Sequence, residues 1–258
     1  MSVLNSIVEG VRADLAEREA RISLSECKKR ALDAAPALPF LPVEQFGLIC
    51  EVKRSSPSKG HLAEISNPAE LASQYEAGGA LAISVLTEQR RFNGSLDDLD
   101  AVRAAVNIPI LRKDFTVTEY QIYEARAHGA DLVLLMASAL NDAQLKDFYA
   151  LSTDLGMTAL VETHTSEEME RVRALDAGLI GVNARNLKDL TVDTARVAPI
   201  MEQAPQGTTL VAESGVESVD DIRTYAQAGA HVVLCGEALV KAGDPRASVE
   251  EFTRAGRQ

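Results

Sequence analysis

The chain contains 258 residues, of which 46% are hydrophobic and 25% charged, a composition typical of a globular protein. Its longest apolar stretch, from Leu132 to Leu140, is far shorter than the roughly 20 residues that a membrane-spanning helix requires. The 38 acidic residues outnumber the 26 basic ones and give a formal net charge of −12, which argues against a nucleic-acid partner. A few lysines gathered in a cleft could still attract a small anionic substrate.

The first residues and the cysteines indicate an intracellular protein. Charged residues interrupt the apolar region that a signal peptide would need, at Glu9, Arg12 and Asp14. The three cysteines are too few and too scattered for a disulfide framework or a CxxC metal site; they are Cys27, Cys50 and Cys235. We therefore expect a reduced, cytoplasmic setting and no membrane association.

Residues 1–46 precede the first buried strand and are expected to be helical. Apolar residues recur there at helical spacing: Leu4, Ile7, Val8, Val11 and Leu15. Ser23 and Glu26 have the spacing of a capping box and predict the start of a second helix, which Ala35-Pro36 should end. The segment is too small for an independent domain, so we expect a helical extension packed on the main body.

Eight short runs rich in Val, Ile and Leu then recur along the chain. They begin near Leu48, Leu81, Ile108, Asp131, Met157, Leu179, Thr208 and His231. Runs that are apolar throughout suit strands buried on both faces, as in a parallel sheet.

Helix-start signals lie between these runs. Asn67-Pro68 places a cap before a proline at the first helical position, and Thr118 and Thr165 each precede a Gln or Glu at capping-box spacing. Eight strand–helix units predict an α/β fold, a single (β/α)8 TIM barrel over residues 47–258. The alternative is an open doubly wound sheet, which usually has fewer repeats and a GxGxxG after its first strand. The loop from Ser55 through Lys59 to Gly60 does not match that motif.

Polar residues end several of the apolar runs, at the edge where such barrels hold their functional groups. The set is Lys53, Lys113, Glu162, Asn183 and Glu213. A single charge at a strand end is most simply a solvated loop residue, but a set at the same end of several strands indicates a site. Two lysines and several acids at one mouth suit proton transfer, and burial with mutual charge should bring a Lys pKa down and a Glu pKa up toward neutrality.

Two other features of the sequence bear on its chemistry. The four histidines lie on four different segments and are interpreted as surface or packing residues, not metal ligands; they are His61, His128, His164 and His231. Ser214-Gly215 and Gly236-Glu237 follow the seventh and eighth runs, where many barrels bind phosphate on backbone N–H groups. Ordinary tight turns are the alternative for either pair alone.

Five ordered segments resemble the indole-3-glycerol phosphate synthase family of tryptophan biosynthesis. They run from Glu51 to Ser58 (EVKRSSPS), Phe92 to Leu96 (FNGSL), Pro109 to Phe115 (PILRKDF), Gly181 to Leu187 (GVNARNL) and Ala212 to Gly215 (AESG). The resemblance spans nearly the whole chain, including the extension. Cys235, where an aliphatic residue is usual, is a departure outside the reacting groups.

The resemblance implies a carboxy-lyase reaction. The family closes an indole ring on 1-(2-carboxyphenylamino)-1-deoxyribulose 5-phosphate, with loss of carbon dioxide and water and without metal or cofactor. It implies Lys113 as general acid and Glu162 as general base. Lys53 would meet the anionic groups of the substrate or act as acid in dehydration, and Glu51 would hold Lys53 or Lys113 by charge.

The remaining site residues also follow from the resemblance. Asn183 and Glu213 would bind substrate hydroxyls and orient the ring-closing conformer. The other expected substrate contacts are Ser56, Phe92, Phe115, Arg185, Leu187, Ser214, Gly215, Gly236 and Glu237. Phe92, Phe115 and Leu187 would form apolar walls, although core or loop packing is an equal interpretation for Leu187.

Two alternatives remain open from the sequence. One is phosphoribosylanthranilate isomerase, also a phosphate-binding barrel, which the N-terminal extension and the two lysines disfavour. The other is a non-catalytic barrel that binds a phosphate ligand or a partner protein, which would have no need of Lys113 and Glu162 beside a phosphate site. We expect a monomer, with association with other tryptophan-pathway enzymes left open.

Overall fold

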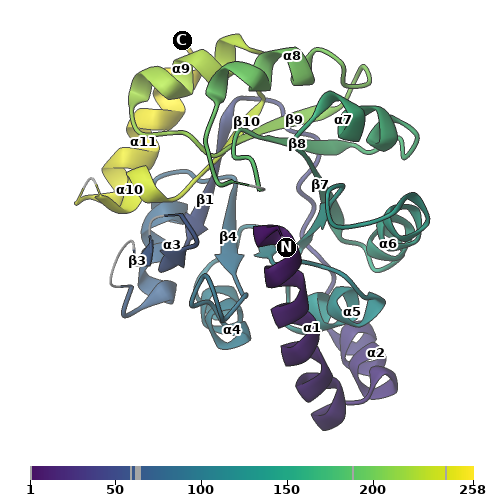
Figure 1. The fold of residues 1–258 in the computed structure, drawn as a ribbon. Coiled ribbons are helices and arrows are strands. Elements are labelled where there is room, and N and C mark those ends of the chain that lie inside the picture. Colours follow the sequence, from purple (N-terminus) through teal and green to yellow (C-terminus); the bar gives the residue numbers. More distant parts are fainter. Residues whose placement is uncertain (1, 59, 62–64, 188, 242) are drawn as a thin grey trace.

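The computed structural model describes residues 2–58, 60–61, 65–187, 189–241 and 243–258. Lys59, expected in the loop after the first strand, lies outside the described residues. Eight parallel strands close into a barrel in the order β1-β10-β9-β8-β7-β6-β5-β4 (Figure 1). The predicted (β/α)8 fold is therefore confirmed, and the open sheet is excluded because β1 pairs with both β4 and β10.

Each barrel strand begins within two residues of the apolar run that predicts it. The strands are β1 (Gly47–Val52), β4 (Ala82–Leu86), β5 (Ile110–Lys113), β6 (Leu132–Met136), β7 (Thr158–Thr163), β8 (Leu179–Asn183), β9 (Thr209–Glu213) and β10 (Val232–Cys235). A short hairpin of β2 (Ser55–Ser56) and β3 (Gly60–His61) follows β1 and had no signal in the sequence pattern.

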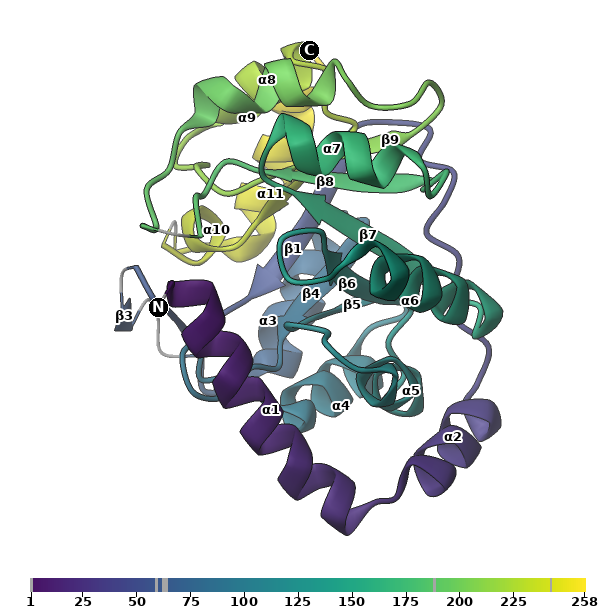
Figure 2. The same cartoon turned by 45° about the vertical axis from the view of Figure 1, so that its right-hand side comes forward.

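Helices surround the barrel (Figure 2). They are α3 (Pro68–Ala77), α4 (Leu96–Ala105), α5 (Glu119–Ala127), α6 (Asp142–Asp154), α7 (Ser166–Arg173), the 3-10 turn η1 (Thr194–Arg196) with α8 (Val197–Met201), α9 (Val219–Gln227), α10 (Glu237–Lys241) and α11 (Pro245–Gly256). No helix among the described residues has both the length and the apolar character to cross a membrane.

Most predicted helix starts form as expected, and one does not. The Asn67 side chain caps α3, and Thr165 accepts the backbone N–H of Glu168 at 3.2 Å. The expected capping box of Thr118 and Gln121 is wrong. Thr118 Oγ1 is buried without a hydrogen-bond partner, and the Gln121 side chain bonds the loop backbone at Phe115 and Val117 and not the Thr118 N–H.

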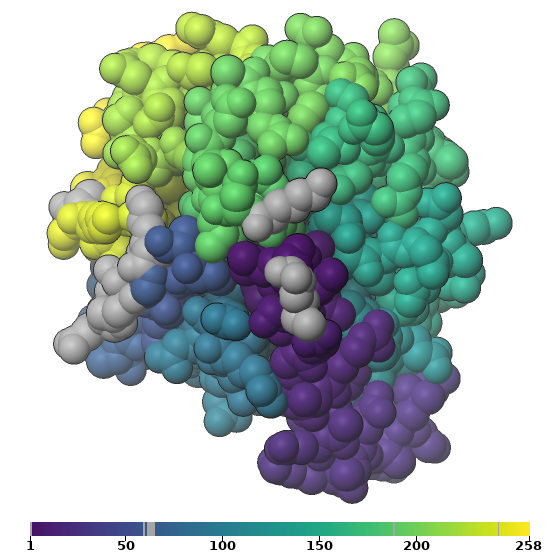
Figure 3. Space-filling view, viewed as in Figure 1, coloured from purple at the N-terminus to yellow at the C-terminus, as the bar shows by residue number. Residues whose placement is uncertain are grey.

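The N-terminal extension consists of α1 (Val3–Arg21) and α2 (Leu24–Asp33), ending just before the predicted Ala35-Pro36 stop. One face of α1 is buried, at Ile7, Val11 and Leu15. In Figure 3 the start of this purple helix lies against green and blue segments near the centre of the face shown. The extension therefore covers part of the barrel.

Alternation along the strands divides the core into two layers. Ile49, Leu111 and Leu160 belong to the cluster inside the barrel, while their neighbours Cys50 and Val161 belong to the cluster between barrel and helices. Successive strand residues point to opposite faces, so residues two positions apart share a layer.

Arg112 is the largest fully buried side chain and lies on the outer side of β5. Its guanidinium is 3.0 Å from Asp114 Oδ2 and 2.9 Å from Glu124 Oε2, and Arg18 of α1 contacts the same Glu124 at 2.8 Å. Thr87 Oγ1 donates to Asp114 Oδ2 at 2.6 Å. This network joins α1, α5 and β5 behind the strand that carries Lys113.

We expect Arg112→Met to lower the free energy of unfolding by about 3–5 kcal/mol, because it leaves two buried carboxylates without their shared cation. Urea denaturation of both proteins measures the loss. The matched control is Arg223→Met, which removes an exposed ion pair with Asp220 and should cost less than about 1 kcal/mol. Equal losses in the two variants would show that the buried network contributes no more than a surface pair.

Candidate active site

The strand alternation aims the predicted polar residues into the barrel mouth. Lys113 lies two residues beyond Leu111, Glu162 two beyond Leu160, and both of those leucines are inside the barrel. Glu213 likewise follows Val211, which belongs to the same inner cluster. Parallel strands bring these ends to one rim, so the side chains converge there.

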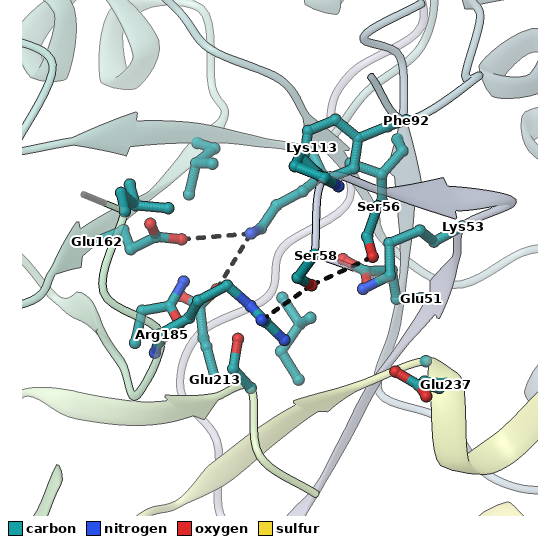
Figure 4. A pocket seen from close by; sticks show the side chains of 18 of the residues that line it. Glu51, Lys53, Ser56, Ser58, Phe92, Lys113, Glu162, Arg185, Glu213 and Glu237 are labelled. Carbon is teal, nitrogen blue, oxygen red and sulfur yellow. Dashed lines mark hydrogen bonds and ion pairs between the residues drawn. The ribbon is translucent and has the colours of Figure 1, made fainter. Parts of the chain in front are cut away.

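A cavity occupies this end of the barrel. Every site residue expected from the sequence lines it: Glu51, Lys53, Ser56, Phe92, Lys113, Phe115, Glu162, Asn183, Arg185, Leu187, Glu213, Ser214, Gly215, Gly236 and Glu237. Figure 4 shows many of these side chains converging from different strands and loops.

Lys113 lies between two carboxylates at the bottom of this cavity. Its Nζ is 3.2 Å from Glu162 Oε2 and 3.1 Å from Glu213 Oε2 (Figure 4). The two glutamates are almost fully buried, and the Lys113 side chain is 13% exposed. One cation therefore serves two buried acids.

Because Lys113 is shared, the pKa values of Glu162, Glu213 and Lys113 are shifted in different ways. Burial would raise the pKa of Glu162, but Lys113 and then His164 hold it well below its usual range. Burial and the charge of Glu162 raise the pKa of Glu213 to about 8, despite the attraction of Lys113. Burial would lower the pKa of Lys113, yet the Glu213 and Glu162 carboxylates raise it above its ordinary value.

These directions correct part of the expectation from sequence. A glutamate pKa does rise toward neutrality, but at Glu213 and not at Glu162. The expected fall in a lysine pKa is wrong for Lys113, because two acids face one base and their attraction outweighs the burial. The raised pKa of Lys113 and the lowered pKa of Glu162 favour an ammonium and a carboxylate at neutral pH.

Glu51 and Lys53 form a second ion pair on the end of β1. The two side chains share a face of the strand, as their spacing predicts. Glu51 thus contacts Lys53 directly, and its charge also contributes to the raised pKa of Lys113. Gly236 makes room for the pair, because a Cβ at that position would lie 2.9 Å from the Glu51 Cβ.

Loops from two strands meet above the cavity through Arg185. Its guanidinium donates to Ser58 Oγ at 3.0 Å and to the Leu190 carbonyl at 3.1 Å. The backbone N–H of Arg185 donates to Asn183 Oδ1 at 2.9 Å. Burial lowers the pKa of Arg185 somewhat. The guanidinium is thereby held over the mouth as a cation available to an anionic ligand.

One wall of the cavity is apolar. The rings of Phe92 and Phe115 lie 6.0 Å apart, centre to centre, at 42°. Leu187 packs beside the inner core cluster and also lines the cavity, so its position is compatible with both interpretations. The cavity has further apolar lining residues that the sequence did not indicate, among them Ile7, Leu134 and Met136. Ile7 was read only as a packing residue of the extension.

The opposite rim presents backbone atoms. Ser214 and Gly215 have φ angles of 68° and 79°, in the left-handed region, and a Cβ on Gly215 would lie 2.6 Å from Thr194 Cγ2. Gly236 lies just before α10, and Glu237 is its first residue. Such turns expose N–H groups that suit a phosphate.

Two residues beside the acids were not identified from the sequence. His164 was interpreted as a surface or packing histidine, but its Nε2 lies 3.2 Å from Glu162 Oε1. Gly181, in the middle of β8, leaves the space that the Glu213 carboxylate occupies. A glycine inside an apolar strand often marks a position that another group approaches closely. Gly181 was therefore the available signal in the sequence.

The structure is a closed (β/α)8 barrel with a lysine between two buried acids, an apolar wall and glycine-containing turns at its rim. These features define a class of barrels equipped for acid–base chemistry on an anionic ligand. A family model for indole-3-glycerol phosphate synthase matches residues 4–252. The chain belongs to this family, which confirms the resemblance identified from the sequence and sets aside the isomerase alternative.

Curated relatives agree along nearly the full length. The indole-3-glycerol phosphate synthase of Mycolicibacterium gilvum (strain PYR-GCK) is 58% identical, with 99% of this chain and 95% of that protein covered. The indole-3-glycerol phosphate synthase of Arthrobacter sp. (strain FB24) is 56% identical, with 99% and 97% covered.

Solved structures with low identity share the fold. A 3-hexulose-6-phosphate synthase aligns with a TM-score of 0.65 and 21% identity, covering 82% of this chain and 99% of that one. A thiamine phosphate pyrophosphorylase from Pyrococcus furiosus aligns with a TM-score of 0.60 and 16% identity, covering 83% and 96%. At these identities the likeness concerns the barrel alone.

We expect Gly181→Ala to lower turnover about 100-fold, because a methyl group there overlaps the Glu213 carboxylate and forces it away from Lys113. Steady-state kinetics together with a thermal melt measure the effect. Gly178→Ala is the control: it lies just before the same strand, where the added methyl meets only the end of the Leu41 side chain at 3.0 Å. A fully active Gly181→Ala variant would show that the position of Glu213 is unimportant.

Proposed function

We propose that this chain closes the indole ring of 1-(2-carboxyphenylamino)-1-deoxyribulose 5-phosphate, releasing carbon dioxide and water. The observation that supports this best is Lys113, an ammonium held at 3.1–3.2 Å between two buried carboxylates at the bottom of a cavity with one apolar wall. The aromatic ring would lie on the Phe92 and Phe115 side. The phosphate would lie at the rim formed by Ser214, Gly215, Gly236 and Glu237.

In the first step, the ring carbon that bears the carboxylate attacks the substrate ketone. Negative charge develops on the ketone oxygen, and Lys113 donates a proton to it, leaving a hydroxyl. The ring nitrogen becomes cationic, and the Glu162 carboxylate stabilises this charge. Carbon dioxide then leaves from the attacking ring carbon, and the electrons of the broken C–C bond restore the aromatic ring.

The second step removes the hydroxyl as water. A general acid protonates it, the nitrogen lone pair expels it, and Glu162 takes a proton from the neighbouring carbon. Two protons enter and one leaves, so the carboxylate form of the substrate consumes one proton for each product formed. Asn183 and Glu213 orient the substrate hydroxyls throughout.

The proposal allows two alternative roles for Lys53, and steady-state kinetics of a Lys53 variant distinguish them. As an anion-binding residue, it would affect mainly KM; as the acid of dehydration, it would affect mainly kcat. Its ion pair with Glu51 is compatible with both. Arg185, held over the mouth, supplies a second cation for the anionic groups of the substrate.

The proposal also includes the cellular location, the oligomeric state and the cofactor requirement of the protein. The three cysteines are free and buried, as a reducing cytoplasm permits. We place the chain there as a monomer that acts without metal or cofactor. An assay that follows the fluorescence of the indole product tests the activity directly: purified protein with the substrate should produce the signal, and a protein that binds the substrate without producing it would be a non-catalytic barrel.

We expect Lys113→Met to fold and to bind the substrate, but to lose nearly all turnover. The methionine keeps the length of the apolar stem and removes the proton and the charge, which act chiefly as the oxygen becomes negative. Lys146→Met, on the exposed face of α6, is the control and should be close to wild type. A Lys113→Met variant that mainly raises KM would make Lys113 a binding residue.

We expect Glu162→Gln to lower kcat by about 10²–10⁴-fold, the usual contribution of a positioned acid–base group. The amide keeps the shape of the carboxylate, so folding and substrate binding should change little. Single-turnover kinetics with the folded variant check this. Unchanged turnover would remove Glu162 from the mechanism.

A further inference from the structure

His164 follows the last residue of β7 and lies two positions beyond Glu162. It is buried, with 5% of its surface exposed, and it is absent from the described residues that line the cavity. The acid–base steps above do not use it. Its ring nevertheless joins Glu162, the proposed base, to Glu168 near the start of α7.

Both ring nitrogens of His164 face carboxylates. Nε2 is 3.2 Å from Glu162 Oε1, an ion-pair distance without hydrogen-bond geometry, and Nδ1 is hydrogen-bonded to Glu168 Oε2 at 3.3 Å. A neutral imidazole carries one N–H, so it would turn a lone pair toward one of the two anions. The doubly protonated imidazolium instead places positive charge at ion-pair distance from both carboxylates, and this arrangement therefore favours a positively charged ring.

Glu168 is itself fixed in place. Its carboxylate accepts the backbone N–H of His164 at 2.7 Å, while its own N–H donates to the Thr165 cap. Arg196, from η1, donates to the His164 carbonyl. The charged groups that face His164 are thus Glu162 of β7, Glu168 of α7 and Arg196 of η1.

The two acids beside Lys113 differ in one respect. Glu162 contacts two cations, Lys113 and the His164 ring, whereas the only cation in ion-pair contact with Glu213 among the described residues is Lys113. When one lysine is shared by two buried acids, an additional cation beside one of them makes that acid the stable anion.

We propose that His164 is a positioning residue that holds Glu162 in its ionised form and orientation, so that Glu162, and not Glu213, is the base. The His164 ring stabilises the Glu162 carboxylate by direct contact, and the contact with Glu168 fixes the orientation of the ring. The inference rests on the proposed role of Glu162 in the function above.

The contact also has a consequence for pH dependence. Burial opposes protonation of His164, but the Glu162 and Glu168 contacts raise its pKa to about 9, so the ring is charged at neutral pH. Loss of that charge removes one of the cations that depress the pKa of Glu162. The acid limb of the kcat–pH profile, where Glu162 becomes protonated and inactive, should then move to higher pH.

Two substitutions test the proposal. We expect His164→Leu, which removes both donors and the charge, to lower kcat about 10–100-fold and to raise the acid limb by about one pH unit. His164→Gln offers one uncharged donor to Glu162 and should recover part of kcat without restoring the acid limb. KM should stay within about twofold of wild type, because the ring does not line the cavity.

The control is His128→Leu. His128 also pairs with an acid, Asp100 at 2.7 Å, but it lies at the end of α5 away from the described cavity lining. Its kcat and pH profile should match wild type. His164 variants that match this control, or that lower kcat without moving the acid limb, would overturn the proposal. If His164→Leu does not fold, the acid limb of His164→Gln decides the outcome.

The Glu162→Gln background separates this inference from the proposed function. Adding His164→Gln to Glu162→Gln should cause no further loss, since no carboxylate remains to be held. A full second loss in the double variant would overturn the positioning role and leave the function intact. Unchanged turnover in Glu162→Gln alone would overturn both.

Discussion

The contact of one lysine with two buried acids is the constraint on which the rest of the site depends. Buried charges are costly unless they are paired, and Lys113 is the shared partner of Glu162 and Glu213. With one cation between them, the two acids cannot be equivalent, and the environment of each decides which holds the charge. The divergence of their pKa values follows from this shortage of positive charge and not from any difference in residue type.

The barrel builds this arrangement through the two-residue period of its strands. Arg112 and Lys113 are consecutive basic residues on β5, yet they serve different layers. Arg112 turns outward into a closed network with Asp114 and Glu124, whereas Lys113 turns inward to the acids of the cavity. Stability is thus concentrated behind the strand and chemistry in front of it, and a change in one layer need not remove the other.

Much of this could be predicted from the sequence because it depends on strand period and strand order. Apolar runs located all eight strands, and their polar ends identified Lys113, Glu162 and Glu213 as neighbours far apart in the chain. The β2–β3 hairpin escaped prediction because its two-residue strands are too short to give an apolar pattern. The unused Thr118 cap escaped prediction because it depends on which groups nearby side chains bond. Gln121, for example, bonds the Phe115 carbonyl and the Val117 N–H, and no spacing rule indicates that choice.

The electrostatics could not be predicted for a different reason. Residue type and position identify which groups meet, but a pKa depends on how many opposing charges each group contacts and how deeply it is buried. The sequence analysis placed Lys113 correctly and assigned its pKa the wrong direction, since the number of acids at its ammonium was unknown. The same applies to His164: only the structure shows that its two nitrogens face two carboxylates, and this contact gives Glu162 the second cation that Glu213 lacks.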